Sequence, residues 1–180
     1  MGTQLDTLVA THVIDVPDFP QPGVMFKDLT PLFADGPAFH ELIDGIVAGY
    51  RRDDGSLGFD VVAGIEARGF VIAAAVAYAA RVGVVAVRKA GKLPRDTISA
   101  SYALEYGDAA LEVHTDAFVA GERVLVVDDV LATGGTATAT LGLIEQAGGI
   151  VAGLCVLLEL GFLGGRQRLA DRDLWALLTV

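Results

Sequence analysis

The amino-acid sequence predicts an α/β fold, in which helices cover both faces of a mainly parallel sheet. Short, continuous apolar runs of strand length alternate with longer segments of helical spacing, which is typical of strands buried on both faces. A weaker polar–apolar alternation between Thr97 and Thr115 indicates an antiparallel ribbon that interrupts this order. With 180 residues, the chain is expected to form one domain, residues 1–180.

The elements are expected in a simple order along the chain. Residues 1–36 carry four of the six prolines and indicate a short helix followed by extended chain. Pro37–Tyr50 has apolar side chains at helical spacing, with Asp35 or Gly36 near the N-cap. The remaining expected elements are strand Phe59–Ala63, helix Gly69–Ala80, strand Val84–Val87, strand Val124–Val127, helix Thr136–Gln146, strand Ile150–Leu158, a helix near Phe162–Ala170 and a strand near Leu174–Leu178.

The ribbon at Thr97–Thr115 would turn about Gly107-Asp108. It follows a basic stretch, and together the two form a long excursion from the α/β core. Excursions of this kind are often lids over an active site. We therefore expect a lid at about residues 88–114.

The composition narrows the class of partner. A formal charge of −10 argues against binding to nucleic acid or to an anionic membrane surface, since both draw on a basic surface. The longest apolar stretch, Phe70–Ala80, is too short to span a bilayer, and the N-terminus does not read as a signal peptide. The single cysteine, Cys155, excludes an internal disulfide and is interpreted as a small core residue. A cytoplasmic protein is expected.

Positive charge is concentrated in one stretch. It holds five of the 13 Lys and Arg residues, and no acid lies among them in sequence. A solvated surface segment and a site for a small, highly charged anion both fit this pattern, and composition does not separate them. The five residues are Arg81, Arg88, Lys89, Lys92 and Arg95.

The segment V-L-V-V-D-D-V-L-A-T-G-G-T-A, Val124–Ala137, is the strongest indication of chemistry. A buried strand leads to Asp128 and Asp129, and a Thr/Gly-rich turn then opens a helix. Such a turn offers hydroxyls and free backbone N–H groups to a phosphate, and ligands of open α/β sheets lie at this end of the strands. Two carboxylates would repel a triphosphate but suit the hydroxyls of a sugar. The residues expected to hold a sugar phosphate are Asp128, Asp129, Ala132, Thr133, Gly134, Gly135 and Thr136.

Other phosphate motifs fit this segment less well. A Walker A loop requires G-x-x-x-x-G-K-[ST], and Gly135 stands where its lysine would help. Neither Gly64–Gly69 nor Gly161–Gly165 supplies the G-x-G-x-x-G of a dinucleotide fold. A third alternative is that the acids are solvated turn residues and the Thr/Gly run only caps a helix.

Five ordered segments resemble the type I phosphoribosyltransferases, and the first and fourth point to the adenine branch. They are D-F-P-Q-P-G-V-M-F-K-D-L-T-P-L, G-I-E-A-R-G-F, V-R-K-A-G-K-L-P, S-Y-A-L-E-Y-G and V-V-D-D-V-L-A-T-G-G-T, between about Asp18 and Leu160. The resemblance implies a type I phosphoribosyltransferase-like parallel sheet flanked by helices, with an antiparallel lid ribbon. It also implies transfer of ribose 5-phosphate from phosphoribosyl diphosphate to adenine, giving AMP and diphosphate in purine salvage.

The resemblance further implies roles for individual residues. The loop Glu66–Gly69, which in this family often contains a non-proline cis peptide, would bind diphosphate through its backbone. Glu105 would be the general acid/base toward the purine nitrogens. Diphosphate would be bound by Arg68, Gly69, Arg88, Lys89 and Lys92. Adenine would stack between Phe26 and Leu160, and backbone groups of Met25 and Lys27 would read its edge.

The same resemblance implies a bound Mg²⁺, held mainly by substrate and water rather than by protein ligands. It also implies a homodimer. Two rival functions remain open on the sequence. One is transfer to another purine base, and the other is a non-catalytic regulator that only binds phosphoribosyl diphosphate. Ala132 in the phosphate loop and the lack of lysine in Ile150–Leu160 favour adenine over 6-oxopurines.

Overall fold

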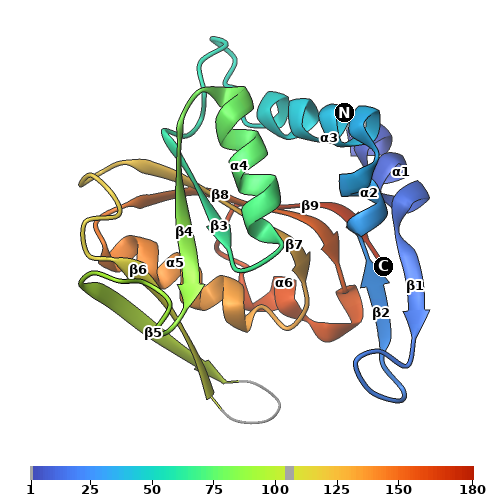
Figure 1. Ribbon diagram of the computed structural model, residues 1–180. Coiled ribbons are helices and arrows are strands. Elements are labelled where there is room, and N and C mark those ends of the chain that lie inside the picture. Colours follow the sequence, from blue (N-terminus) through green and yellow to red (C-terminus); the bar gives the residue numbers. More distant parts are fainter. Residues whose placement is uncertain (1, 104–107) are drawn as a thin grey trace.

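The computed structural model describes residues 2–103 and 108–180, and its described part is built around a seven-stranded sheet (Figure 1). The strand order is β5-β6-β4-β3-β7-β8-β9. Strands β4, β3, β7, β8 and β9 run parallel, and the β5–β6 ribbon joins the edge at β4 in antiparallel pairing. The bounds are β3 Val61–Ile65, β4 Gly83–Lys89, β5 Thr97–Ala103, β6 Asp108–His114, β7 Arg123–Leu131, β8 Ile150–Glu159 and β9 Leu174–Thr179. The predicted α/β fold is confirmed.

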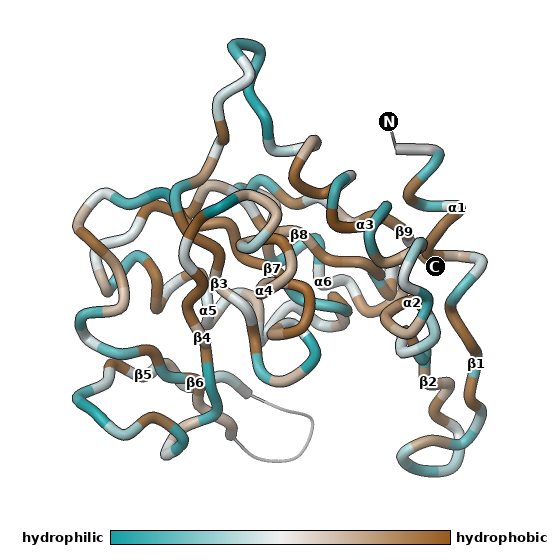
Figure 2. Tube along the Cα trace, turned by 45° about the horizontal axis from the view of Figure 1, so that its top comes forward, coloured by the Kyte–Doolittle hydropathy of each residue, from teal (hydrophilic) through white to brown (hydrophobic). Residues whose placement is uncertain are grey.

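Helices cover both faces of this sheet because successive strand side chains point to opposite sides. Val62 packs into a core with helices α1 to α4, whereas its neighbours Val61 and Ala63 pack into a second core with α5. Figure 2 shows the central strands as largely hydrophobic, as two-sided burial requires. The helices are α1 Gly2–His12, α2 Thr30–Ala34, α3 Gly36–Gly49, α4 Gly69–Ala80, α5 Gly135–Gln146, the 3₁₀ turn η1 Gly161–Leu163 and α6 Gly165–Arg168.

A separate hairpin lies in the N-terminal region. Strands β1 (Ile14–Pro17) and β2 (Met25–Asp28) pair antiparallel in a two-stranded sheet apart from the main one. The sequence predicted extended chain here but not the pairing, because the connecting turn does not have the short Asn-Gly or Asp-Gly pattern of a tight hairpin. Strand β2 carries the residues expected to read adenine.

Several expected bounds differ from the structure by one or two residues, β3 among them, and two elements differ more. Strand β7 continues to Leu131, so Asp128 and Asp129 lie inside the strand rather than after it, since β7 pairs with β8 over this whole length. The single helix expected near Phe162–Ala170 is instead the turn η1 and the short α6. Gly164 separates them with φ of 69°, a left-handed conformation that glycine adopts without a steric penalty. Cys155 is fully buried, as predicted.

An ion pair joins the N-terminal ends of β3 and β7. Arg123 donates through Nε to Asp60 Oδ2 at 2.8 Å and through a terminal nitrogen to Oδ1 at 2.5 Å. These hydrogen bonds from Arg123 lower the pKa of Asp60 to about 2. A carboxylate whose pKa is lowered by folding contributes stability above its ordinary pKa, and this contribution is lost as the pH falls toward the folded-state value.

We expect Asp60→Asn to lower the free energy of unfolding at pH 7 by at most about 1 kcal/mol, because the pair is partly exposed and solvent screens it. The difference from the parent should shrink as the pH falls from about 5 toward 2, because the unfolded parent's carboxylate takes up a proton over this range while the folded one stays charged. Chemical denaturation at several pH values measures this. A difference that does not change with pH would show that packing, rather than charge, causes it.

Candidate active site

The candidate site lies where parallel strands β3 and β7 end side by side. Gly64 of β3 is paired with Val127 of β7, so the turn after β3 and the loop after β7 leave the sheet at the same edge. Ligands of open α/β sheets bind at this edge. Residues that are about 60 positions apart in sequence are thereby brought together.

The β7–α5 loop surrounds a small cavity of about 90 Å³ at the start of α5. Gly134 has φ of 80°, and a Cβ there would lie 2.9 Å from the carbonyl oxygen of Gly165. A Cβ on Gly165 would in turn overlap the carbonyl oxygen of Ala132. The first N–H groups of a helix have no partner within it, so they are free to bind a phosphate. The lining residues are Asp128, Val130, Leu131, Ala132, Thr133, Gly134, Gly135, Thr136, Ala137, Leu154 and Val156.

The acid pair lies beside this loop. Asp129 is 5% exposed, and its backbone N–H donates to Asp128 Oδ1 at 3.0 Å. Burial, followed by the charge of Asp129, raises the pKa of Asp128 above its usual range. Arg68 Nε approaches Asp129 Oδ2 to 2.5 Å as an ion pair, yet this oxygen has no aligned hydrogen bond within residues 2–103 and 108–180. The pair therefore has unused capacity to accept hydrogen bonds.

The β3–α4 turn packs closely against the acid pair. A Cβ on Gly69 would lie 2.9 Å from Asp128 Oδ1 and equally close to the carbonyl oxygen of Val127, so only glycine fits here without displacement. The Glu66–Ala67 peptide bond of the turn is cis and involves no proline, as the family resemblance led us to expect. The turn predicted to bind diphosphate thus adjoins the acids predicted to bind ribose.

Two carboxylates hold the basic stretch in place. Glu66 accepts a hydrogen bond from the backbone N–H of Lys89 at 2.9 Å and lies 3.4 Å from Arg88 Nε. Glu112, 5% exposed, accepts from the backbone N–H groups of Lys92 and of the next residue, both at 2.8 Å. Backbone hydrogen bonds are the largest cause that lowers the pKa of each acid. The stretch contains no acid in sequence, but acids from elsewhere surround it in the structure.

The aromatic ring of Phe26 on β2 also reaches this region. The guanidinium carbon of Arg68 lies 5.2 Å from the ring centroid, within the range of a cation–π contact. Arg68 therefore connects Phe26 to Asp129. The ammonium group of Lys27 donates to Asp15 of β1 at 2.7 Å, so its side chain is engaged within the hairpin.

The remaining predicted residues have less defined surroundings. Met25 is 51% exposed. Leu160, the residue after β8, donates its backbone N–H to the carbonyl oxygen of Leu131 at 2.9 Å. Glu105 lies outside the described residues. Over the described part of the chain, no group of three or more His, Cys, Asp or Glu side chains forms a metal site, and no helix there is long and apolar enough to cross a membrane.

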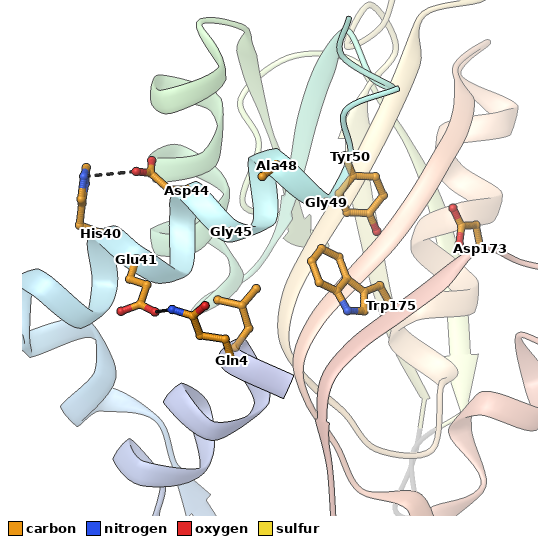
Figure 3. A pocket seen from close by; sticks show the side chains of 11 residues that line it. Gln4, His40, Glu41, Asp44, Gly45, Ala48, Gly49, Tyr50, Asp173 and Trp175 are labelled. Atoms are coloured by element: carbon orange, nitrogen blue, oxygen red, sulfur yellow. Dashed lines mark hydrogen bonds and ion pairs between the residues drawn. The ribbon is translucent and has the colours of Figure 1, made fainter. Parts of the chain in front are cut away.

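A much larger cavity, about 900 Å³, lies away from this region, between α1, α3 and β9 (Figure 3). Glycines at two positions of α3 let large side chains approach the helix closely. A Cβ on Gly45 would overlap Leu5, and a Cβ on Gly49 would overlap Trp175. None of the predicted site residues lines this cavity. Its size therefore does not identify the active site.

Comparison with known proteins agrees with this geometry. Residues 33–176 match the family model described as phosphoribosyl transferase domain. An adenine phosphoribosyltransferase from Salinispora arenicola is 75% identical over 99% of this chain and 93% of that protein, and one from Salinispora tropica is 72% identical over the same shares. The crystal structure of adenine phosphoribosyltransferase from Saccharomyces cerevisiae, complexed with an iminoaltritol bisphosphate and adenine, superposes with a TM-score of 0.92 at 35% identity, covering 98% of this chain and 99% of that one.

A second crystal structure, the adenine phosphoribosyltransferase from Thermoanaerobacter pseudethanolicus, has a TM-score of 0.89 at 44% identity over 98% of this chain and all of that one. The fold and the loop after β7 define the chain as an enzyme with a phosphoribosyltransferase domain of the type I class. Within this class, the chain belongs to the adenine phosphoribosyltransferase family, whose activity serves purine salvage.

Proposed function

We propose that the edge formed by β3, β7 and their loops transfers ribose 5-phosphate from phosphoribosyl diphosphate to adenine. The acid pair next to a helix-opening loop is the observation that supports this most directly. In this proposal Asp128 and Asp129 accept hydrogen bonds from the ribose hydroxyls, and the loop residues 132–136 bind the 5′-phosphate. Release of AMP and diphosphate from phosphoribosyl diphosphate, adenine and Mg²⁺ tests it, because a non-catalytic regulator would bind the first substrate without turnover.

The leaving group requires stabilisation of negative charge. Breaking the anomeric C–O bond leaves positive charge on the ribose and negative charge on diphosphate. Arg68, Arg88, Lys89, Lys92 and the backbone at Gly69 would bind the diphosphate. Glu66 and Glu112 hold the basic stretch mainly through its backbone, which leaves the lysine ammonium groups available.

A bound Mg²⁺ would supply further positive charge to the departing diphosphate. The acids of the site fit an ion held mainly by substrate and water. Asp128 Oδ1 already accepts from the backbone N–H of Asp129, and Asp129 faces Arg68, so neither carboxylate is fully free for an inner coordination sphere. Mg²⁺ usually retains several of its waters, and the substrate's oxygens can complete its ligands.

On the side of the attacking nucleophile, the purine base must be held in position and a nearby group must accept its proton. Adenine would stack between Phe26 and Leu160, with backbone groups of Met25 and Lys27 at its edge. Glu105 would exchange the proton on the purine nitrogens, and residues 88–114 would close as a lid that excludes water. In the structure Arg68 contacts both the Phe26 ring and Asp129. Arg68 therefore lies between the proposed base-stacking ring and the acid pair, in the turn proposed to bind diphosphate.

A homodimer is part of the proposal. Helix α4 is apolar on nearly every side, and Val71 and Tyr78 of its outer face are 47% and 87% exposed. Val84 of the neighbouring β4 is 52% exposed. Large apolar side chains that are exposed in one subunit are candidates for a protein interface. A cytoplasmic location, the absence of a nucleic-acid partner and a single domain stay predictions.

We expect Asp128→Asn and Asp129→Asn each to weaken binding of phosphoribosyl diphosphate, by roughly 1.5–3 kcal/mol for each lost charge-assisted hydrogen bond. Calorimetric titration of both variants measures the loss. Asp60→Asn, at the opposite end of the same strands, is the matched control and should bind normally. Unchanged affinity in both site variants would remove the ribose assignment.

A further inference from the structure

An ion pair between a buried carboxylate and a half-exposed guanidinium lies next to the proposed site. The side chain of Glu159, at the end of β8, is 5% exposed. Arg166 of α6 donates through Nε to both carboxylate oxygens at 3.0 Å and through a terminal nitrogen to Oε2 at 2.6 Å. Thr179 of β9 adds a hydroxyl at 3.3 Å from Oε2. The carboxylate thus joins the ends of β8 and β9 to α6.

Each member of the pair is the direct chain neighbour of a residue that shapes the site. Glu159 precedes Leu160, the proposed stacking partner of adenine. Arg166 follows Gly165, which lies so close to the phosphate loop that a Cβ on Gly134 would be 2.9 Å from its carbonyl oxygen. The pair therefore connects the surroundings of the base to those of the 5′-phosphate.

The intervening chain does little to fix this connection by itself. Residues 160–165 contain three glycines, and their only regular structure is the short 3₁₀ turn η1 and the first residue of α6. Glycine loses the most conformational freedom on folding, so such a segment needs side-chain contacts to keep one shape. A bidentate guanidinium–carboxylate pair provides fixed geometry as well as attraction.

We propose that Glu159 and Arg166 are positioning residues that hold Leu160 and the phosphate loop at a fixed separation. This inference rests on the proposed function. The pair itself touches neither substrate. Its loss lets η1 and α6 move away from the loop, and this movement disturbs the base and phosphate subsites together.

Arg166→Met tests the proposal, with KM for both substrates as the readout. We expect KM to rise about tenfold for adenine and for phosphoribosyl diphosphate, with kcat within about threefold, because lost positioning weakens binding of ground state and transition state alike. Arg166→Lys retains the charge but loses the bidentate geometry, and it should recover part of both affinities. Adding Glu159→Gln to Arg166→Met should raise neither KM much further, since the two residues act as a unit.

Asp60→Asn is the control for a general loss of stability. It weakens another bidentate Arg–carboxylate pair, Asp60–Arg123, at the opposite end of the sheet, and both KM values should stay at the parent's. All assays are run well below each variant's thermal midpoint. Unchanged KM values in Arg166→Met, or a rise for only one substrate, would overturn the proposal that the pair positions both subsites. A parent enzyme that forms no AMP would instead overturn the proposed function itself.

Discussion

Replacing Glu105 by Gln is expected to slow AMP formation by about 10²–10⁴-fold, the usual contribution of general acid/base catalysis. Glutamine keeps the shape of the side chain but cannot take up a proton from the purine. KM for adenine should change far less than turnover, since the stacking contacts remain. Single-turnover measurement is required, because slow product release could hide the change in the chemical step.

Glu41→Gln is a suitable control for Glu105→Gln. Glu41 is an exposed glutamate of α3 that contacts Gln4, and it lines the cavity away from the proposed site. Its turnover should equal the parent's. A rate within about threefold of the parent for Glu105→Gln would show that another group, or water, transfers the proton.

Adenine is expected to be preferred over hypoxanthine and guanine, by as much as about 10⁴. A 6-oxopurine needs a donor for its oxygen, whereas the 6-amino group of adenine needs only an acceptor such as a backbone carbonyl. A buried polar group left unpaired costs about 1–3 kcal/mol. Related enzymes for 6-oxopurines have an aspartate where this chain has Ala132 and a lysine near the next strand, which β8 lacks.

The structure strengthens this expectation at one point. The only charged side chain of β8 is Glu159, and the nearby cation Arg166 already donates three hydrogen bonds to it. These contacts engage the Nε proton and one terminal N–H of the guanidinium, so its positive charge is already paired with Glu159. Initial rates with the three bases at equal concentration, with phosphoribosyl diphosphate and Mg²⁺, measure the preference. Comparable rates with hypoxanthine would contradict it and leave the phosphoribosyl site intact.

Local pattern was sufficient for most of the fold. Helix α4 begins at Gly69 and ends at Ala80, as its apolar run predicts. Turns flank both ends of the helix, so its bounds do not depend on which strand it packs against. The β7–α5 segment is equally local, since the strand, the acid pair, the loop and the helix are continuous in sequence. These features allowed the phosphate loop and the acid pair to be predicted. The ends of β7 and α6 could not be predicted, because pairing with β8 and the glycine at position 164 decide them.

The sequence by itself determined the α/β class, the order of the core elements, the Thr/Gly-rich loop that opens α5, and the family. Only the tertiary structure decided which charges meet. Arg68 and Asp129, like Arg88 and Glu66, come from different strands or turns, and their pairing depends on the parallel register of β3 with β7 and with β4. Periodicity reports which face of an element is buried, but it carries no information on which distant side chain lies opposite. Ion pairs form only between groups that lie a few ångströms apart, so the register of the strands decides which charges pair.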